Sequence, residues 1–427
     1  MLAGVAQIEI TPSAGIALSG YIARRGPALG AHDPLYAKAL VLDNGATQAA
    51  LVTVDVLGLP RSVVANVRAA IAAQTGIPAA NILIACSHTH AGPATMVLQG
   101  CGEVDPAYLQ TLQERIVAVT TQAWANRRPA RFGVGHGQVT AGVHNRRNPG
   151  AVIDPDLAIV RVDDTDGRPL AVLLNYACHP TCVTGENQLF SAEYCGYAAA
   201  RIQQATDAIT LFFTGAITLF FTGAIGDVGP SRRGWDVLEL IGDAVAEEAL
   251  RVLPTIAVTE WQTLTSVSRA VELPLQPLPT VADLAVFTAE QQRLLADAER
   301  MQQPYQPQIV AAMLNWTAAT LTTVTAPAAP TTVTTEIQAI RAGDLCFVSA
   351  PGELFVELGL AVKADAPTDH LFLCGFGNDN IGYIPTPHAY PQGGYEIADA
   401  YKYYRYPAAL APEAGQHYVA TAVELLY

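Results

Sequence analysis

The sequence predicts an α/β fold of mixed α+β character, in which mixed β-sheets are flanked by helices within a single large catalytic domain. Short apolar runs with strand composition alternate along the 427 residues with longer segments of helical periodicity. Several short runs are apolar throughout, as expected of strands covered on both faces. No linker rich in Pro, Gly or Ser divides the chain, and we interpret the nearest candidate, 274–279, as the boundary of an insertion. One domain is therefore predicted over 1–427.

The first half of the chain begins with three strands and a helix whose apolar residues recur at helical spacing. A hairpin is predicted at Asp164-Thr165-Asp166-Gly167, because this composition is typical of a tight turn between strands. In order, the expected elements are strands at 5–10, 37–43 and 49–55, a helix at about 61–75, a strand at 81–85, a helix at about 106–126, and strands at 131–139, 157–162 and 170–177.

The second half continues the alternation and ends in a tail, from 376 onward, that is rich in Tyr, Pro and Gly and closes with a helix. This continued alternation supports the same fold class. The expected helices lie at 192–206, 234–252, 281–317 and 353–363, and the expected strands at 260–272, 333–341, 344–350 and 370–375.

An eight-residue unit, Ile-Thr-Leu-Phe-Phe-Thr-Gly-Ala, occurs at 209–216 and again, unchanged, at 217–224. The uncharged run 208–226 that contains both copies is long enough to span a bilayer. Its Thr, Phe and Ile content, with Gly near the end of each unit, instead predicts a strand followed by a turn. We therefore expect a tandem duplication and no transmembrane segment, with the second copy leading into the motif at 226–230.

Composition and charge exclude several classes of partner. Hydrophobic residues make up 51% of the chain and charged residues 15%, which indicates a large buried core. A net charge of −14 argues against nucleic-acid binding and against docking on anionic membranes, since both need clustered Lys and Arg. The seven cysteines form no Cys-x-x-Cys pair and have mostly apolar neighbours, which is typical of reduced, buried thiols. With no signal peptide recognised at the N-terminus, the expected location is the cytoplasm.

Residues with chemistry to offer follow the ends of expected strands. His88 and His90 come after the strand 81–85, and side chains two apart on an extended segment project the same way. They could share a metal, or one could bind it while the other handles protons, or both could be ordinary core or surface histidines. His179 ends a second apolar strand and precedes a proline, so it is expected in a loop facing a cleft, unless its ring only bonds a loop carbonyl.

Glu353 and Tyr383 are two further candidates for a functional site, and each also has a simple structural explanation. Glu353 follows the strand 344–350, where it either serves a site or is an acid at a helix N-terminus favoured by the helix dipole. Tyr383 lies in a segment, 377–387, that is too polar and turn-rich for a core strand, and spacing alone does not select it as a ligand. The aromatic run nearby either lines an entrance for an apolar substrate or packs at the domain's edge. Its members are Tyr401, Tyr403, Tyr404 and Tyr406.

Six short motifs occur in an order that resembles the N-terminal catalytic domain of the neutral/alkaline (non-lysosomal) ceramidases. The likeness covers nearly the whole chain, from Ile8-Glu9-Ile10-Thr11-Pro12 and Gly20-Tyr21 to the tyrosine-rich tail. The motifs are Cys86-Ser87-His88-Thr89-His90-Ala91-Gly92-Pro93, Asn145-Arg146-Arg147-Asn148-Pro149, Cys178-His179-Pro180-Thr181, Gly226-Asp227-Val228-Gly229-Pro230, Pro351-Gly352-Glu353, and Gly382-Tyr383 with Tyr395-Glu396.

The resemblance implies a zinc-dependent hydrolase of amide bonds acting on a lipid-like or small-molecule N-acyl substrate. Zn²⁺ lowers the pKa of bound water to about 7 and polarises a carbonyl, the two requirements of amide hydrolysis. The implied proton carrier is His90, with oxyanion donors at Arg146 and Tyr395; Arg147 is the competing arginine. The implied zinc ligands are His88, His179, Glu353 and Tyr383.

The sequence also departs from the family pattern. Gly229 stands where the family has a serine near substrate, and Ser191-Ala192-Glu193 stands where it has Ser-Gly-Asp. We also expect no counterpart of the C-terminal immunoglobulin-like domain of the larger members. These departures weaken the inference that ceramide itself is the substrate.

Three alternatives to this function can be compared with the sequence. A zinc esterase, lactonase or small-molecule amidase would use the same site, because amides and esters share a tetrahedral intermediate. A metallo-β-lactamase fold also begins with His-x-His, but it requires Asp-His where this chain has Ala91-Gly92. The missing serine leaves room for a metal- or lipid-binding scaffold without catalysis. The sequence does not determine the oligomeric state.

Overall fold

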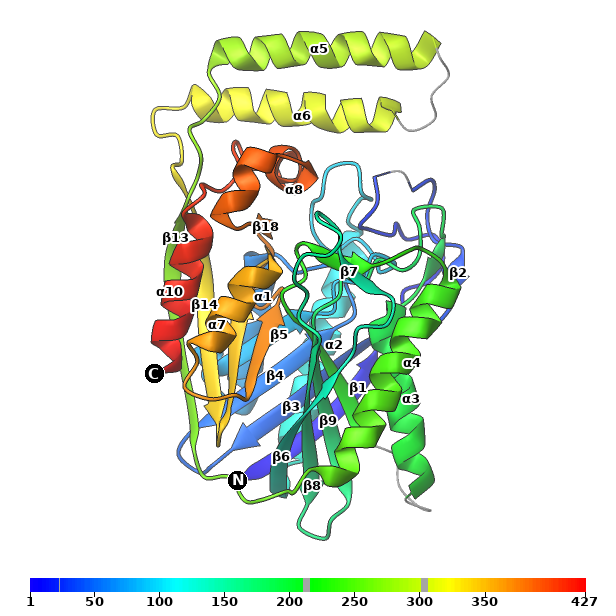
Figure 1. Cartoon of the computed structure of the whole chain (residues 1–427), viewed down its shortest axis with the longest axis vertical. Helices are drawn as coiled ribbons and strands as arrows, with labels where there is room; N and C mark the ends of the chain where they lie inside the picture. The colour runs from blue at the N-terminus through cyan, green and yellow to red at the C-terminus, as the bar shows by residue number, and fades with distance from the viewer. Residues whose placement is uncertain (23, 210–215, 301–305) are drawn as a thin grey trace.

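Two β-sheets lie face to face, with helices on both outer faces, in the computed structural model (Figure 1), which describes residues 1–22, 24–209, 216–300 and 306–427. The larger sheet has eight strands in the order β11-β9-β8-β6-β1-β3-β4-β5, and the smaller has the order β13-β14-β15-β17. Both mix parallel and antiparallel neighbours, so the predicted mixed sheets are confirmed. Their bounds are β1 (Leu2–Glu9), β3 (Tyr36–Asp43), β4 (Gln48–Val54), β5 (Ile82–Cys86), β6 (Arg128–Gln138), β8 (Asp156–Asp164), β9 (Pro169–Tyr176) and β11 (Ile217–Thr222), then β13 (Leu264–Pro274), β14 (Thr332–Ala342), β15 (Leu345–Ala350) and β17 (Leu371–Gly375).

Apolar side chains from both sheets fill the space between them. Phe221 of β11 lies against Phe347 of β15 and Phe372 of β17, with ring centroids 5.9 and 6.0 Å apart. These rings are fully buried. Burying such side chains on both sides of each sheet explains why the strands are apolar throughout instead of alternating.

Helices cover the two outer faces, as the sequence predicts. Asp105 caps α2 by accepting a hydrogen bond from the Tyr108 amide at 2.8 Å, and Gly76 ends α1 in the left-handed region at φ 79°. The helices of the larger sheet are α1 (Arg61–Thr75), α2 (Pro106–Ala125), α3 (Glu193–Ile209) and α4 (Trp235–Val252), and those of the smaller are α7 (Val356–Ala364) and α10 (Ala414–Leu426).

The ends of parallel strands from both sheets meet at one place. The pairs β4–β5, β9–β11 and β15–β17 are parallel, so the two strands of each pair end on the same side. Gly375, at the end of β17, lets the edges of the two sheets touch, because a Cβ there would lie 2.8 Å from the Gly223 carbonyl oxygen. The loops that carry His88, His179 and Glu353 all start from these ends.

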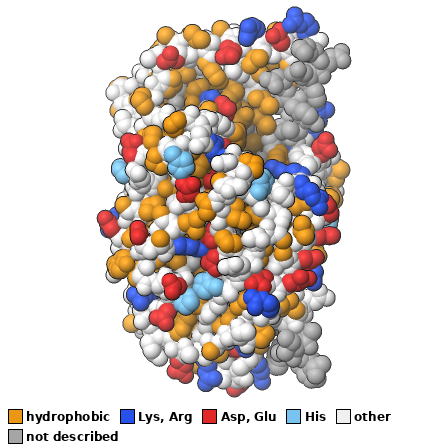
Figure 2. Space-filling view, viewed as in Figure 1, with side chains coloured by type: hydrophobic (Ala, Val, Ile, Leu, Met, Phe, Trp, Pro, Cys, Tyr) orange, Lys and Arg blue, Asp and Glu red, His pale blue; other side chains and the backbone are white. Residues whose placement is uncertain are grey.

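The single helix predicted over 281–317 is wrong. The chain forms two helices, α5 (Val281–Arg300) and α6 (Gln306–Val324), which pack against each other. The sequence between them contains Pro304, which lacks the amide donor that a continuing helix needs. The two helices lie beyond α8 (Tyr395–Ala398) in Figure 1, and hydrophobic side chains gather below them on the face shown in Figure 2.

The helix predicted over 353–363 begins later than expected. Glu353–Leu354 forms a short strand, β16, that pairs in parallel with β18 (Tyr383–Ile384), and α7 starts only at Val356. Glu353 is therefore not an acid at a helix N-terminus. The register pairs Glu353 directly with Tyr383, so a tertiary contact places a two-residue strand inside the polar segment 377–387.

The second copy of the duplicated unit forms β11, as predicted, and leads through a turn to β12 (Val228–Pro230), which pairs with β7 (Val143–Asn145). Most of the first copy lies outside the described residues. A similar two-residue pair joins β2 (Gly30–Ala31) to β10 (Leu189–Phe190), and α9 spans Ala400–Tyr403.

All seven cysteines are buried and unpaired. In the part of the chain that is described, no helix combines the length and apolarity needed to cross a bilayer.

Candidate metal centre

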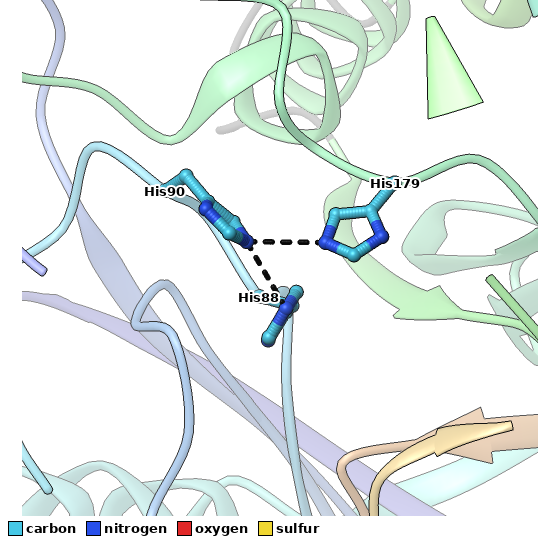
Figure 3. A group of neighbouring side chains, drawn as sticks. All are labelled: His88, His90 and His179. Atoms are coloured by element: carbon cyan, nitrogen blue, oxygen red, sulfur yellow. Dashed lines mark hydrogen bonds between the residues drawn. The ribbon is translucent and has the colours of Figure 1, made fainter. Parts of the chain in front are cut away.

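Three histidines from two loops point their rings toward one another (Figure 3). The Nε2 atom of His90 lies 3.2 Å from Nε2 of His88 and 3.1 Å from Nε2 of His179. His88 and His179 are buried and His90 is partly buried. His88 holds this place at φ 61°, unusual for a residue other than glycine, with its ring stacked on Phe376. Together they form a possible metal site.

The opposite ring nitrogen of each histidine faces a backbone carbonyl. Nδ1 of His88 lies 2.6 Å from the Leu57 oxygen, that of His90 lies 2.9 Å from the Gly20 oxygen, and that of His179 lies 3.3 Å from the Ile225 oxygen. A carbonyl only accepts hydrogen bonds, so Nδ1 of His88 and Nδ1 of His90 carry the proton and the Nε2 atoms of these two rings keep a lone pair. Nδ1 of His179 also lies 3.4 Å from Nη1 of Arg146, which can only donate. The two lone pairs on His88 and His90, 3.2 Å apart, repel unless a cation lies beside them, and this arrangement fits a metal ion.

The protonation state of the histidines suits the same role. Burial lowers the pKa of His88 to about 3 and lowers the pKa values of His90 and His179 well below the ordinary range. All three rings are therefore neutral at neutral pH, the form in which imidazole binds metals.

Glu353 adds a carboxylate to this group. Its Oε2 atom lies 3.8 Å from Nε2 of His88 and 3.7 Å from Nε2 of His179. That oxygen is buried and has no hydrogen-bond partner within the described ranges, whereas Oε1 accepts a hydrogen bond of 2.8 Å from the Tyr404 hydroxyl. Burial raises the pKa of Glu353 to about 7. An unpaired buried oxygen beside the imidazole Nε2 atoms of His88 and His179 is a second observation that fits a bound cation.

The structure separates the two adjacent arginines. Arg146 donates from Nη2 to the Tyr383 hydroxyl at 2.8 Å and to the Gly226 carbonyl at 2.6 Å. Both arginines contact Glu396, Arg146 through Nε at 3.2 Å and Arg147 through Nη1 at 2.6 Å, and Arg147 also donates to the Gly393 carbonyl. Arg146 therefore faces the histidines and Arg147 does not.

A cavity of about 310 Å³ brings all the candidate residues together. Tyr395 lies at its mouth, 49% exposed, with its ring centroid 6.0 Å from that of Tyr383. Of the aromatic run, Tyr403 and Tyr404 line this cavity, whereas the other two tyrosines do not. The seven candidates that line it are His88, His90, Arg146, His179, Glu353, Tyr383 and Tyr395.

Tyr404, a member of the aromatic run, donates a hydrogen bond from its hydroxyl to Glu353. The sequence assigns no role to Tyr21 or Arg233, which form part of the cavity wall beside His90. Tyr21 belongs to a motif of the family resemblance, which could have drawn attention to it. Nothing in the local pattern marks Arg233. Gly229 lies beside His179, where a Cβ would be 3.5 Å from the His179 Cβ, so a serine side chain would have room to start there.

Glu193, in the second departure from the family pattern, supports the loop that follows His179. Its carboxylate accepts hydrogen bonds from the amides of Cys182 at 3.0 Å and Val183 at 3.1 Å. The side chain is fully buried, and burial raises its pKa from 4.5 to about 7. Glu193 therefore binds its proton more tightly in the folded chain than in the unfolded one.

This difference predicts how stability depends on pH. The contribution of Glu193 to stability is fully present below pH 4.5 and is lost as pH rises through about 7. We expect the free energy of unfolding of the wild type, relative to Glu193→Gln, to increase by about 3 kcal/mol as pH falls from about 8 to about 4. Urea denaturation across this range measures the difference, with the exposed Glu186→Gln as control. A difference that stays constant with pH would contradict the assignment.

Comparisons with known proteins show which family and which solved structures this chain resembles. Residues 1–239 match the family described as neutral/alkaline non-lysosomal ceramidase, N-terminal. A neutral ceramidase of Pseudomonas aeruginosa is 27% identical over 218 residues, which cover 46% of this chain and 32% of that protein. A neutral ceramidase of Mycobacterium tuberculosis is 30% identical over 141 residues, 28% of this chain and 21% of that protein. Neutral ceramidase A of Dictyostelium discoideum is 27% identical over 174 residues, 36% of this chain and 24% of that protein.

The fold matches over a longer range than the sequence. The crystal structure of neutral ceramidase from Pseudomonas aeruginosa aligns with a TM-score of 0.76 at 20% identity, covering all of this chain and 74% of that one. A structure of a ceramidase complexed with C2 aligns with a TM-score of 0.75 at 18% identity. The fold is therefore shared along the whole chain, whereas the sequence matches span about a third or less of each relative's length.

Proposed function

The chain belongs to the neutral/alkaline non-lysosomal ceramidase family, and from this membership we propose that it is a zinc-dependent hydrolase of amide bonds in N-acyl substrates. The observation that carries the proposal is the convergence of three imidazole Nε2 atoms beside the unpaired Glu353 oxygen, inside a cavity. Such a group of nitrogen and oxygen donors suits Zn²⁺.

The proposed zinc ligands are His88, His179, Glu353 and Tyr383, and the geometry supports adding His90. A bound Zn²⁺ would act as a Lewis acid on the substrate carbonyl and lower the pKa of water to about 7. His90 directs Nε2 at the other two rings and donates from Nδ1 to a carbonyl. Both of its nitrogens are thus engaged, which favours a ligand over the proton carrier expected from the sequence.

The other residues of the cavity would bind and stabilise the reacting amide. Arg146 keeps its positive charge, and Tyr383 and Glu396 orient its guanidinium. Tyr395 lines the same cavity. We propose that both donate hydrogen bonds to the carbonyl oxygen as it gains negative charge.

Apolar packing around the cavity would limit access of water. Leu98 and Cys101 line it and belong to one buried cluster with Ala312 and Met313 of α6. The helical pair α5–α6 therefore backs one wall of the site. A low-polarity wall strengthens the electrostatic contribution of Arg146 to catalysis.

Metal analysis combined with a substrate panel tests the proposal. We expect zinc stoichiometric with the purified chain, loss of hydrolysis on chelation, recovery on adding Zn²⁺, and faster turnover of N-acyl than of matched O-acyl substrates. Faster turnover of the O-acyl series would establish the esterase or lactonase alternative. A chain that binds zinc and hydrolyses nothing would establish the scaffold alternative, and a folded chain that binds no zinc would refute the metal centre.

A further inference from the structure

The walls of the catalytic cavity differ in chemistry. On one side Ile22, Leu57 and Leu98 present apolar surface next to Tyr403. Beside His90, the wall consists of Tyr21, Thr181 and Arg233. An acyl chain fits the apolar wall, and the cationic wall calls for a different group on the substrate.

The guanidinium of Arg233 is hydrogen-bonded through one nitrogen only, so its other two nitrogens can donate to a ligand. It lies between β12 and α4, and its Nη1 donates to the Tyr21 hydroxyl and, at 2.6 Å, to the Thr181 carbonyl. Across the described residues, Nε and Nη2 form no hydrogen bond, and no carboxylate pairs with this guanidinium. Its neighbour Arg232 is instead paired with Asp236. A guanidinium anchored in this way is suited to binding a carboxylate through two parallel hydrogen bonds.

The surroundings of Arg233 leave positive charge uncompensated. Arg24 also lies against the Tyr21 ring, donates to the carbonyls of Ser19 and His90, and has no ion-pair partner among the residues described. The carboxyl facing both arginines is Glu193, whose pKa burial raises to about 7, so it offsets them only in part. In a chain of net charge −14, such a wall attracts an anionic group to one place in the cavity.

We infer that the substrate is an N-acyl amino acid: its acyl chain lies on the apolar wall, and the carboxylate of its amine half binds Arg233. The inference rests on the proposed function, since it concerns the same cavity. In the reaction the amide C–N bond breaks; water supplies the hydroxyl of the new carboxylic acid and a proton to the leaving nitrogen. A cavity of about 310 Å³ lies at the small end of ligand sites, so it fits a single short acyl chain better than a lipid with two long chains.

Two amides that differ only in the charge of the amine half test the inference. N-hexanoylglycine ends in a carboxylate and N-hexanoylethanolamine in a hydroxyl, on the same acyl group. We expect the wild type to favour N-hexanoylglycine by about 10- to 100-fold in kcat/KM, and Arg233→Met to reduce that preference to within about threefold. Arg233→Met should still hydrolyse the neutral amide, which shows that it folds. Arg232→Met, which removes the same charge one residue away, should keep the preference.

A binding measurement separates this inference from the proposed function. The keto acid analogue of N-hexanoylglycine, with a methylene group in place of the N–H, cannot be hydrolysed. Calorimetry should show about 10-fold or greater loss of its affinity in Arg233→Met and no loss for the matching neutral keto alcohol. If no amide is hydrolysed but this Arg233-dependent binding persists, carboxylate recognition stands and the proposed hydrolysis fails. If amides are hydrolysed without preference for the charged one, or a short-chain ceramide is preferred, hydrolysis stands and this inference is overturned.

Discussion

Replacing His179 by alanine is expected to remove the metal and to lower kcat/KM for amide hydrolysis by at least ~10³-fold. The reason is the geometry of the site, in which Nε2 of His179 lies 3.1 Å from Nε2 of His90 and 3.7 Å from a Glu353 oxygen. Removing one imidazole donor weakens the hold on the ion, and we expect the variant to lose it on purification. Without it, water keeps its ordinary pKa of about 15.7 and the carbonyl is not polarised. Metal content and kcat/KM of the purified variant measure both effects.

His90→Ala distinguishes the two roles considered for this residue. If His90 is a ligand, as its geometry favours, the variant loses metal as His179→Ala does. If it carries protons, as the family resemblance implies, the variant keeps the metal and loses only turnover. His388→Ala is the matched control, because this histidine is 60% exposed and pairs with Glu357 at the surface. Retention of metal and activity by His179→Ala would contradict the proposed centre altogether.

Replacing Arg146 by methionine is expected to lower kcat by about 10²- to 10³-fold while KM changes little, a loss of about 3–4 kcal/mol of transition-state stabilisation. The guanidinium is held by the Tyr383 hydroxyl at 2.8 Å and the Gly226 carbonyl at 2.6 Å, inside the cavity that contains the histidines. A donor fixed in this way costs no reorganisation when the oxyanion forms, so its effect appears mainly in kcat. Steady-state kinetics on one N-acyl substrate, with metal content as a check, give the result.

The neighbouring arginine supplies the control. Arg147 shares the Glu396 partner but turns away from the cavity, so Arg147→Met should leave kcat within about threefold and lower the free energy of unfolding instead. If the Tyr395 hydroxyl also donates to the oxyanion, Tyr395→Phe should raise the activation free energy by about 2–4 kcal/mol and so lower kcat. If Arg146→Met and Arg147→Met lower kcat equally, the two arginines contribute to activity by stabilising the fold and not by binding the oxyanion.

The elements that the sequence predicts well are those defined by their own residues. The hairpin of β8 and β9 forms at Asp164, whose side chain accepts hydrogen bonds from the Asp166 and Arg168 amides within the turn. The prediction of a single helix over 281–317 was wrong because the apolar spacing continues on both sides of Pro304, and that spacing alone does not show that the segment is two helices, α5 and α6. The predicted start of the helix at 353 was wrong for a different reason: Glu353 lies in a two-residue strand that exists only through pairing with Tyr383, thirty residues later in the chain.

Local sequence is sufficient to predict the alternation of strands and helices, the buried strands, and the family motifs that mark the candidate ligands. These depend on neighbouring residues, whose propensities and periodicity act over a few positions. Three features become apparent only in the folded chain: His90 converges with His88 and His179, Arg146 and not Arg147 enters the cavity, and Arg233 lies in its wall. These features depend on contacts between the ends of strands in two different sheets. The direction of a loop side chain there is set by distant backbone partners, which no local pattern records.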